Sequence, residues 1–220
     1  MLTTSKENYL KAVYKHKKGE NKPVSASCIA DELQISNAAI SGMAKRLSEE
    51  GLLDYKKYKG LQLTKEGEKL ALKVIRRHRL WEYFLIKVLD LSWAEVHDEA
   101  ENLEHSTSEF LIDKMDEFLG FPKFDPHGSP IPDKNGKLPE SPILLKMQAC
   151  EIGITYKIAR VQDGNTQLMN YLTRIGINLN TEIKIVEKFS FDNSINIEME
   201  GGTFLLSEKV AESVWVTLEI

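Results

Sequence analysis

The chain has 220 residues, of which 42% are hydrophobic and 28% are charged, and its formal net charge is −4. This length suffices for one large domain or for two to three small ones. Because no apolar run approaches the roughly 18 residues that span a bilayer and the start has no hydrophobic signal core, the composition excludes a membrane protein and predicts a cytoplasmic one.

Charge is distributed unevenly along the chain. Residues 1–75 contain 14 Lys and Arg against 9 Asp and Glu, which gives +5. Residues 76–142 contain 8 against 14, which gives −6, and residues 143–220 contain 7 against 10, which gives −3. A basic first third followed by an acidic middle third indicates a polyanion-binding part joined to a cation-binding part.

The chain contains two cysteines, Cys28 and Cys150. They are too few for a disulfide scaffold and lack the C-x-x-C spacing of many metal and redox motifs. We therefore expect each to be a small, buried apolar side chain rather than a ligand or a nucleophile.

Residues 1–73 are predicted to form a winged helix-turn-helix domain. Apolar residues recur at helical spacing in three segments, residues 4–18, 24–35 and 36–50. Ser36 is the natural N-cap of the third segment, and Thr64 is placed to cap the helix that follows. Residues 52–63 alternate as a short hairpin does. Two short helices with a tight turn and a basic hairpin after them are typical of DNA-binding proteins.

The second helix of this motif is rich in small and polar residues, which lets its backbone approach base edges in the major groove. The predicted DNA-binding residues of helix and wing are Ser36, Asn37, Ala38, Ala39, Ser41, Gly42, Lys45, Arg46, Lys56, Lys57 and Lys59. The basic ones are placed to contact phosphates. The alternative is a helical hairpin with a merely solvated basic loop. Because a monomer covers too few base pairs for specificity, we expect a homodimer on a palindromic double-stranded DNA operator.

Residues 74–127 are predicted to form an all-helical domain. Its helices are expected to end near residue 89 and to cover residues 92–105 and 106–119. Six of the seven prolines then fall within residues 121–143, and residues 128–142 are predicted to be a linker.

Residues 143–220 are predicted to be mostly β-structure. Short alternating strands such as 182–188, 194–200 and 213–220 are interrupted by one helix near 165–175. A small β-barrel is the natural closure for such strands. The predicted fold class is therefore α+β with several domains.

Potential metal ligands cluster on two of the predicted helices. At 100° per residue, His97, Glu101, Glu104 and His105 fall within about a 100° arc at the edge of an apolar stripe. The preceding helix adds a pair at i and i+4, His78 and Glu82. Burying such groups is costly unless a cation binds them. Imidazoles and carboxylates without a thiolate suit Mn²⁺ or Fe²⁺, and Zn²⁺, Co²⁺ or Ni²⁺ would also bind. The alternative for each residue is a surface charge or a satisfied core histidine.

Three motifs, RRHRLWE (76–82), VHDEAENLEH (96–105) and DPHGSPIP (125–132), together resemble the diphtheria toxin repressor and manganese transport regulator family of metal-dependent transcriptional repressors. MNYLTRIGINLNTEIKI (169–185) resembles the SH3-like, FeoA-like domain of its three-domain members. The resemblance implies a repressor of metal-uptake genes with metal as corepressor.

The resemblance also implies two groups of metal ligands. The principal site would use Asn8, His78, Glu101, Glu104 and His105. A second site would use Glu82, Asp125, His127 and Asp163, and His97 matches a ligand of the iron-type ancillary site. Glu101 stands where iron-type members have a cysteine, which favours manganese. The sequence departs from the manganese pattern at Asn8, where aspartate is usual, and at Lys11, where glutamate can occur. A protonated lysine cannot ligate, which argues against a two-manganese cluster.

Two other functions fit part of the pattern. A metal-dependent hydrolase or oxidase could use the same carboxylates, but it would have no use for a recognition helix followed by a basic wing. A winged-helix regulator triggered by something other than metal would use the histidines and glutamates as an ion-pair network. We expect no enzymatic activity, no small-molecule substrate and no membrane partner.

Overall fold

The computed structural model describes residues 3–17, 22–56 and 60–218. The chain forms two compact units. The N-terminal unit comprises residues 1–78, 103–113 and 132–138, and the C-terminal unit comprises residues 79–102, 114–131 and 139–220.

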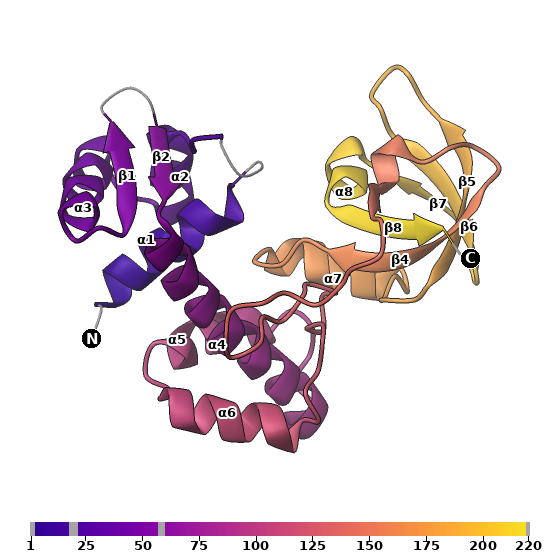
Figure 1. The fold of residues 1–220 in the computed structure, drawn as a ribbon. Helices are drawn as coiled ribbons and strands as arrows, with labels where there is room; N and C mark the ends of the chain where they lie inside the picture. The colour runs from indigo at the N-terminus through magenta and orange to yellow at the C-terminus, as the bar shows by residue number, and fades with distance from the viewer. Residues whose placement is uncertain (1–2, 18–21, 57–59, 219–220) are drawn as a thin grey trace. The chain divides into compact units, whose positions relative to one another are not determined.

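The N-terminal unit contains the predicted winged helix-turn-helix (Figure 1). Its elements are α1 (Thr4–Lys15), α2 (Ala26–Leu33), α3 (Asn37–Glu49), β1 (Leu53–Lys56) and β2 (Gly60–Leu63). Leu10, Ile29, Ile40, Leu47 and Leu61 are fully buried between them. Ser36 caps α3 as predicted, because its hydroxyl accepts a hydrogen bond from the amide of Ala39 at 3.2 Å.

Helix α4 (Lys65–Leu89) begins and ends where the sequence predicts. The Thr64 hydroxyl accepts from the amide of Gly67 at 3.1 Å, which caps its first turn. A Cβ atom at Gly67 would lie 1.9 Å from the carbonyl oxygen of Leu52, so only glycine lets the helix pass this close to the start of the hairpin. Among the described residues, none of the helices is both long and apolar enough to cross a bilayer.

The next two helices, α5 (Val96–Glu104) and α6 (Glu109–Phe118), are shorter than predicted. Ser92 is in a turn rather than a helix, because its amide and hydroxyl both donate to the carboxylate of Glu95. Ser108 accepts from the amide of Leu111 at 3.2 Å and so caps α6. Serines compete for backbone hydrogen bonds in this way, which makes them helix starts rather than helix interiors.

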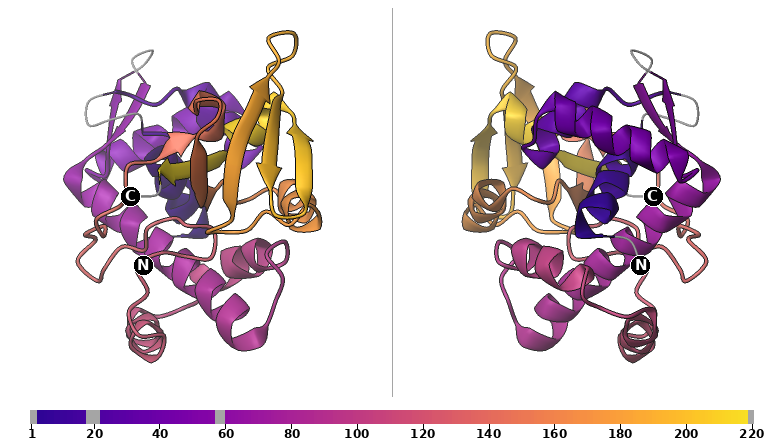
Figure 2. Two further views of the ribbon diagram at one scale, coloured as in Figure 1. Left: turned by 90° about the vertical axis from the view of Figure 1, so that its right-hand side faces the viewer. Right: turned by 90° about the vertical axis from the view of Figure 1, so that its left-hand side faces the viewer.

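The C-terminal unit contains a six-stranded antiparallel sheet, whose strands stand side by side in Figure 2. The strands are β3 (Leu145–Lys146), β4 (Thr155–Val161), β5 (Glu182–Lys188), β6 (Ile195–Met199), β7 (Gly202–Leu206) and β8 (Val214–Leu218). Their order is β3-β8-β4-β5-β6-β7. The short helices are η1 (Met147–Ala149), α7 (Thr166–Arg174) and α8 (Glu208–Glu212). Ile183 and Ile185 of β5 point into the core while Glu182 and Lys184 are exposed, the alternation that a sheet with one buried face requires. The predicted α+β class with an SH3-like last domain is confirmed.

The segment before the sheet is an ordered turn. Asp125 Oδ1 accepts hydrogen bonds from the amides of His127 at 2.8 Å and Ser129 at 2.9 Å. The amide of Val161 in β4 donates to the carbonyl of His127 at 2.9 Å. A Cβ atom at Gly128 would lie 2.0 Å from the carbonyl oxygen of Ala159. The start of the predicted linker is therefore packed tightly against β4, which holds Asp125 and His127 in place.

Candidate metal centres and DNA-binding surface

A first group of candidate ligands lies in the N-terminal unit. His78 of α4 and Glu104 of α5 are both buried, and His78 Nδ1 lies 2.7 Å from Glu104 Oε2. His105 Nε2 lies 3.2 Å from the other oxygen of Glu104, while its Nδ1 lies 2.6 Å from Glu7 Oε2 on α1. Asn8, the next residue of α1, has a buried Oδ1 that accepts no hydrogen bond from any residue in the described ranges.

Lys11 reaches into this group from α1. Its Nζ lies 2.9 and 2.8 Å from the two carboxylate oxygens of Glu104 and 3.4 Å from His78 Nδ1. Only 5% of Lys11 and 0% of Glu104 are exposed. The lysine ammonium therefore contacts both groups that would ligate a metal ion, and it compensates the buried charge of Glu104.

Glu101 lies one turn before Glu104 on α5 and is half-buried. Asp98, Glu99 and Asn102 on the same helix are exposed, as the helical arc predicts.

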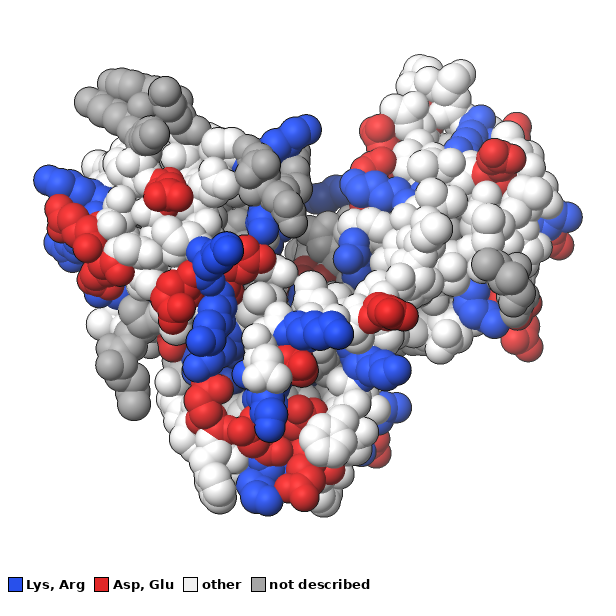
Figure 3. All heavy atoms as spheres, viewed as in Figure 1, with Lys and Arg blue, Asp and Glu red and all other residues white. Residues whose placement is uncertain are grey.

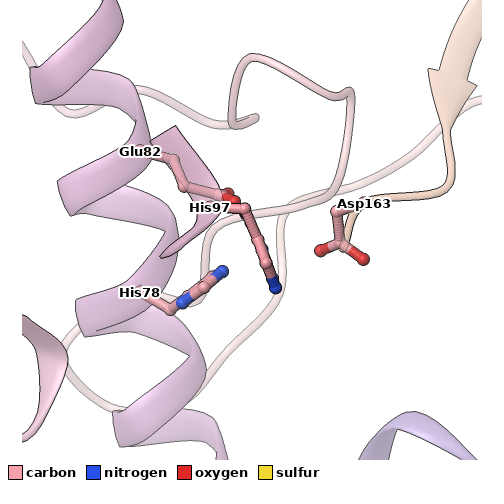
Figure 4. Close-up of side chains that lie close together, drawn as sticks. All are labelled: His78, Glu82, His97 and Asp163. Atoms are coloured by element: carbon pink, nitrogen blue, oxygen red, sulfur yellow. Dashed lines mark hydrogen bonds and ion pairs between the residues drawn. The ribbon is translucent and has the colours of Figure 1, made fainter. Parts of the chain in front are cut away.

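A second group lies in the C-terminal unit. Glu82 of α4, Asp125 and His127 are all buried, and each offers one ligand atom within 4.8 Å of the other two. His127 Nδ1 lies 3.5 Å from Glu82 Oε2. Glu82 Oε1 lies 3.3 Å from Nδ1 of His97 at the start of α5. Glu82, His97 and Asp163 likewise offer ligand atoms within 4.8 Å of one another, with Asp163 coming from the segment after β4 (Figure 4).

The electrostatics of the second group favour an added cation. Burial, followed by the neighbouring charge of Glu82, raises the pKa of Asp125 to about 6 although Arg79 opposes the shift. Burial lowers the pKa of His127, but the adjacent acids Glu82, Asp125 and Asp163 outweigh it and raise the pKa to about 9. Carboxylates this close together resist ionisation, and the histidine retains a proton to balance them.

The donor set of the second group fits a divalent cation. Asp125 uses Oδ1 for the turn, which leaves Oδ2 buried, 3.4 Å from Arg79 Nε and without a hydrogen bond among the described residues. His127 Nδ1 is likewise buried without a hydrogen bond to any described residue. Trp93 stacks on the His127 ring at a centroid distance of 5.6 Å and an interplanar angle of 13°, and its indole nitrogen donates to the Pro126 carbonyl. Backbone hydrogen bonds thus orient Asp125, and the Trp93 ring orients His127. Each keeps a buried oxygen or nitrogen atom available to a cation.

Sequence reasoning did not identify the roles of Glu7, Lys11, Arg79 and Trp93 in these groups. The ion pair of Lys11 with Glu104 joins residues 93 apart in the chain, and the stacking of Trp93 and the placement of Arg79 likewise depend on tertiary packing. Arg79 was visible only as part of the RRHRLWE motif.

The predicted recognition helix presents its residues as expected. Ser36, Asn37, Ala38, Ala39, Gly42, Lys45 and Arg46 are exposed, and Ser41 is half-buried with its hydroxyl donating to the carbonyl of Asn37. Lys56 is in β1, and Lys57 and Lys59 lie outside the described residues. Figure 3 shows basic and acidic side chains next to one another over α3, so this surface is not uniformly positive.

Three family models match the chain in succession. The iron dependent repressor N-terminal DNA-binding domain matches residues 1–61. The iron dependent repressor metal-binding and dimerisation domain matches residues 64–133, and the FeoA domain matches residues 145–218.

Individual repressors and regulators are also similar to this chain. The iron-dependent repressor IdeR of Mycobacterium tuberculosis is 37% identical over 131 residues, 60% of this chain, and the aligned part spans only 56% of that relative. The transcriptional regulator MntR of Oceanobacillus iheyensis is 31% identical over 57% of this chain and 84% of its own. A solved manganese-dependent transcriptional repressor in complex with manganese superposes with a TM-score of 0.90 at 34% identity, over 97% of this chain and all of that one.

Proposed function

The chain belongs to the diphtheria toxin repressor and manganese transport regulator family, in the form with a C-terminal FeoA domain, and on this premise we propose that it is a DNA-binding repressor controlled by a divalent metal ion. The regulated genes are proposed to be those of metal uptake. Membership of a repressor family implies a regulatory rather than a catalytic role. The protein would act in the cytoplasm, where its DNA is.

The observation that carries the proposal is the buried trio of Glu82, Asp125 and His127, whose ligand atoms all lie within 4.8 Å. These residues would hold the ion, with His97 and Asp163 as further candidates. The bound cation would supply positive charge that neutralises the clustered carboxylates. Mn²⁺ is favoured because the donors are oxygen and nitrogen only, with Fe²⁺ as the alternative, and Zn²⁺, Co²⁺ or Ni²⁺ could substitute in vitro.

The first group is proposed to be a weaker metal site. Its ligands would be His78, Glu101, Glu104 and His105 with the carbonyl oxygen of Asn8. Lys11 already pairs with Glu104 in a buried position, so an ion can enter only when this ammonium moves away. Tight metal binding is therefore assigned to the second group.

Two structural features connect the candidate metal ligands to the DNA-binding motif. Helix α4 carries both His78 and Glu82 and starts directly after the wing. Helix α1, which carries Asn8 and Lys11, contacts the recognition helix α3, because the hydroxyl of Tyr9 donates to the carbonyl of Ile40 at 3.3 Å. A metal ion bound by side chains of α1 and α4 would order these helices and thereby bias the position of α3. Metal and DNA must then strengthen each other's binding by the same factor.

Homodimer formation is proposed to use α6. Phe110, Leu111 and Phe118 lie on one face of this helix and are exposed. An apolar stripe of this kind marks a protein interface. A two-fold dimer presents two recognition helices, which matches a palindromic operator. The DNA contacts are proposed to be made by the residues of α3 and of the wing that the sequence predicts.

The test is a gel-shift titration on DNA from the region upstream of the protein's own gene, with Mn²⁺ and with chelator. We expect retarded DNA only with metal. Equal affinity under both conditions would refute the metal-controlled repressor and favour a regulator with another trigger.

A further inference from the structure

Cys28 forms part of a three-residue chain in the N-terminal unit that the proposed function does not use. Its Sγ lies 3.3 Å from Nδ1 of His16, and Nε2 of the same imidazole is paired with a carboxylate oxygen of Glu32. The order thiol, imidazole, carboxylate is the arrangement that activates a nucleophile through a base whose far side is held by a third group.

Local structure produces this order. Cys28 and Glu32 are four residues apart on α2, so their side chains share one face of the helix. His16 is the C-cap residue of α1, where its amide donates to the carbonyl of Ala12 at 3.1 Å. The imidazole is thereby held between the two α2 side chains, with one ring nitrogen for each.

The position of Cys28 on α2 also contributes to the reactivity of its sulfur. Cys28 is the third residue of the helix, within the first turn, where the helix dipole stabilises negative charge. No acidic residue lies in that turn, and the N-cap residue Ser25 makes no side-chain cap because its hydroxyl is 2.6 Å from that of Ser27.

The expectation that both cysteines are buried is wrong for Cys28, which is partly accessible, and is confirmed for Cys150. Cys28 is half-buried, and its neighbours His16 and Glu32 expose 37% and 31% of their side chains. Cys150 is buried in the core of the C-terminal unit, and burial raises the pKa of its thiol to about 11. The chain therefore carries its own matched control, a buried cysteine that is expected not to react.

We propose that Cys28 is a modification site for peroxides, activated by His16 and Glu32. As the sulfur of Cys28 reacts, its proton passes to Nδ1 of His16. The sulfur attacks one oxygen of hydrogen peroxide, an S–O bond forms and the O–O bond breaks. The leaving hydroxide takes the proton of His16, so that the products are a sulfenic acid, neutral His16 and water. Sulfur is oxidised by two electrons and the peroxide is reduced by two.

The modification affects the DNA-reading motif directly. Ile29, next to Cys28, is fully buried in the core that α2 shares with α3. Added oxygen on Cys28 breaks the contact that joins the end of α1 to the start of α2. If the proposed DNA-binding function holds, oxidation lowers the affinity of the protein for its DNA by at least about fivefold. This factor is the lower end of ordinary allosteric coupling.

The test uses the full-length, chelator-treated protein with hydrogen peroxide and dimedone, followed by peptide mass spectrometry. We expect the dimedone adduct on Cys28 and none on Cys150. His16→Gln removes the proton donor and should slow labelling by at least about tenfold, as loss of a general acid-base group does. Cys150→Ser should leave the rate unchanged.

Two outcomes would overturn the proposal: labelling of Cys150 as fast as Cys28, or an unchanged rate in His16→Gln. Should His16→Gln fold poorly by circular dichroism, Glu32→Gln replaces it, since this variant retains the imidazole and is expected to slow labelling by a smaller factor. Labelling requires neither metal nor DNA. A failed gel shift would therefore refute the proposed function and leave the assignment of Cys28 standing.

Discussion

The Nζ atom of Lys11 lies 2.8 Å from Oε2 of Glu104, although 93 residues separate them and both side chains are buried. This pair places a fixed cation among the candidate ligands of the first group. The same contact is therefore expected to stabilise the metal-free protein and to compete with a metal ion.

Replacing Lys11 by Gln tests both roles. We expect the metal-free variant to be less stable by about 3–5 kcal/mol, because the buried carboxylate of Glu104 loses the ammonium that contacts both of its oxygens. Mn²⁺ should restore the loss, and calorimetry should show one more metal ion bound per chain. Lys17→Gln is the matched control, since Lys17 pairs with Glu68 nearer the surface and should cost no more than about 1 kcal/mol. Unchanged stability and stoichiometry in Lys11→Gln would rule out a competing ammonium.

The second group is tested by replacing Asp125 with Asn, which retains an oxygen acceptor for the turn but removes the ligand charge. Affinity for Mn²⁺, measured by electron paramagnetic resonance, should fall by at least about tenfold. Asp133→Asn is a close control, because Asp133 Oδ1 accepts from the amides of Asn135 and Lys137 in the same way yet is exposed. Equal losses in both variants would mean that the turn, not a ligand, was disturbed.

Metal binding should release protons. At pH 7.5 the pKa of about 9 keeps His127 protonated, so binding must displace that proton. At pH 5.5 Asp125, with a pKa of about 6, is mostly protonated as well, so more protons leave and affinity falls. Calorimetry in two buffers of different ionisation enthalpy counts these protons. An affinity independent of pH between 5.5 and 7.5 would contradict the assignment of both residues as ligands.

Arg46 on α3 is expected to contact phosphate rather than a base. Arg46→Ala should weaken binding to all DNA sequences alike and reduce the slope of log affinity against log salt by about 1. The control is Lys209→Ala, on α8 of the C-terminal unit, which should leave the slope unchanged. A loss confined to one base position would instead make Arg46 a base-reading residue.

The dimer is tested on α6. Phe118, which is 71% exposed, should be buried in the dimer, so Phe118→Ser should shift the protein toward monomer in light scattering. Phe191→Ser is the control, because Phe191 is 98% exposed but lies between β5 and β6, far along the chain from α6. Loss of the dimer in Phe191→Ser with none in Phe118→Ser would place the interface at the connection between β5 and β6 instead of on α6.

Much of the fold was predictable because its signals are local. Ser36 and Thr64 cap helices where the sequence places them, and α4 ends at the predicted residue. Caps, periodicity and turn residues act within one or two helical turns, so neighbouring residues suffice to read them. The two shortened helices show the limit of that rule, since Ser92 and Ser108 form hydrogen bonds that a periodic pattern does not reveal.

The sequence by itself determined which side chains are available as ligands and which helices carry them. Only the tertiary structure decided how they combine. His97 and His105 fall on one arc of a helical wheel, yet His97 pairs with Glu82 while His105 pairs with Glu7. Helical periodicity specifies the face on which a side chain lies, but its neighbours come from packing between segments far apart in the chain. For the same reason the sequence showed that Lys11 departs from the manganese pattern of the family, but it did not show that Lys11 contacts Glu104.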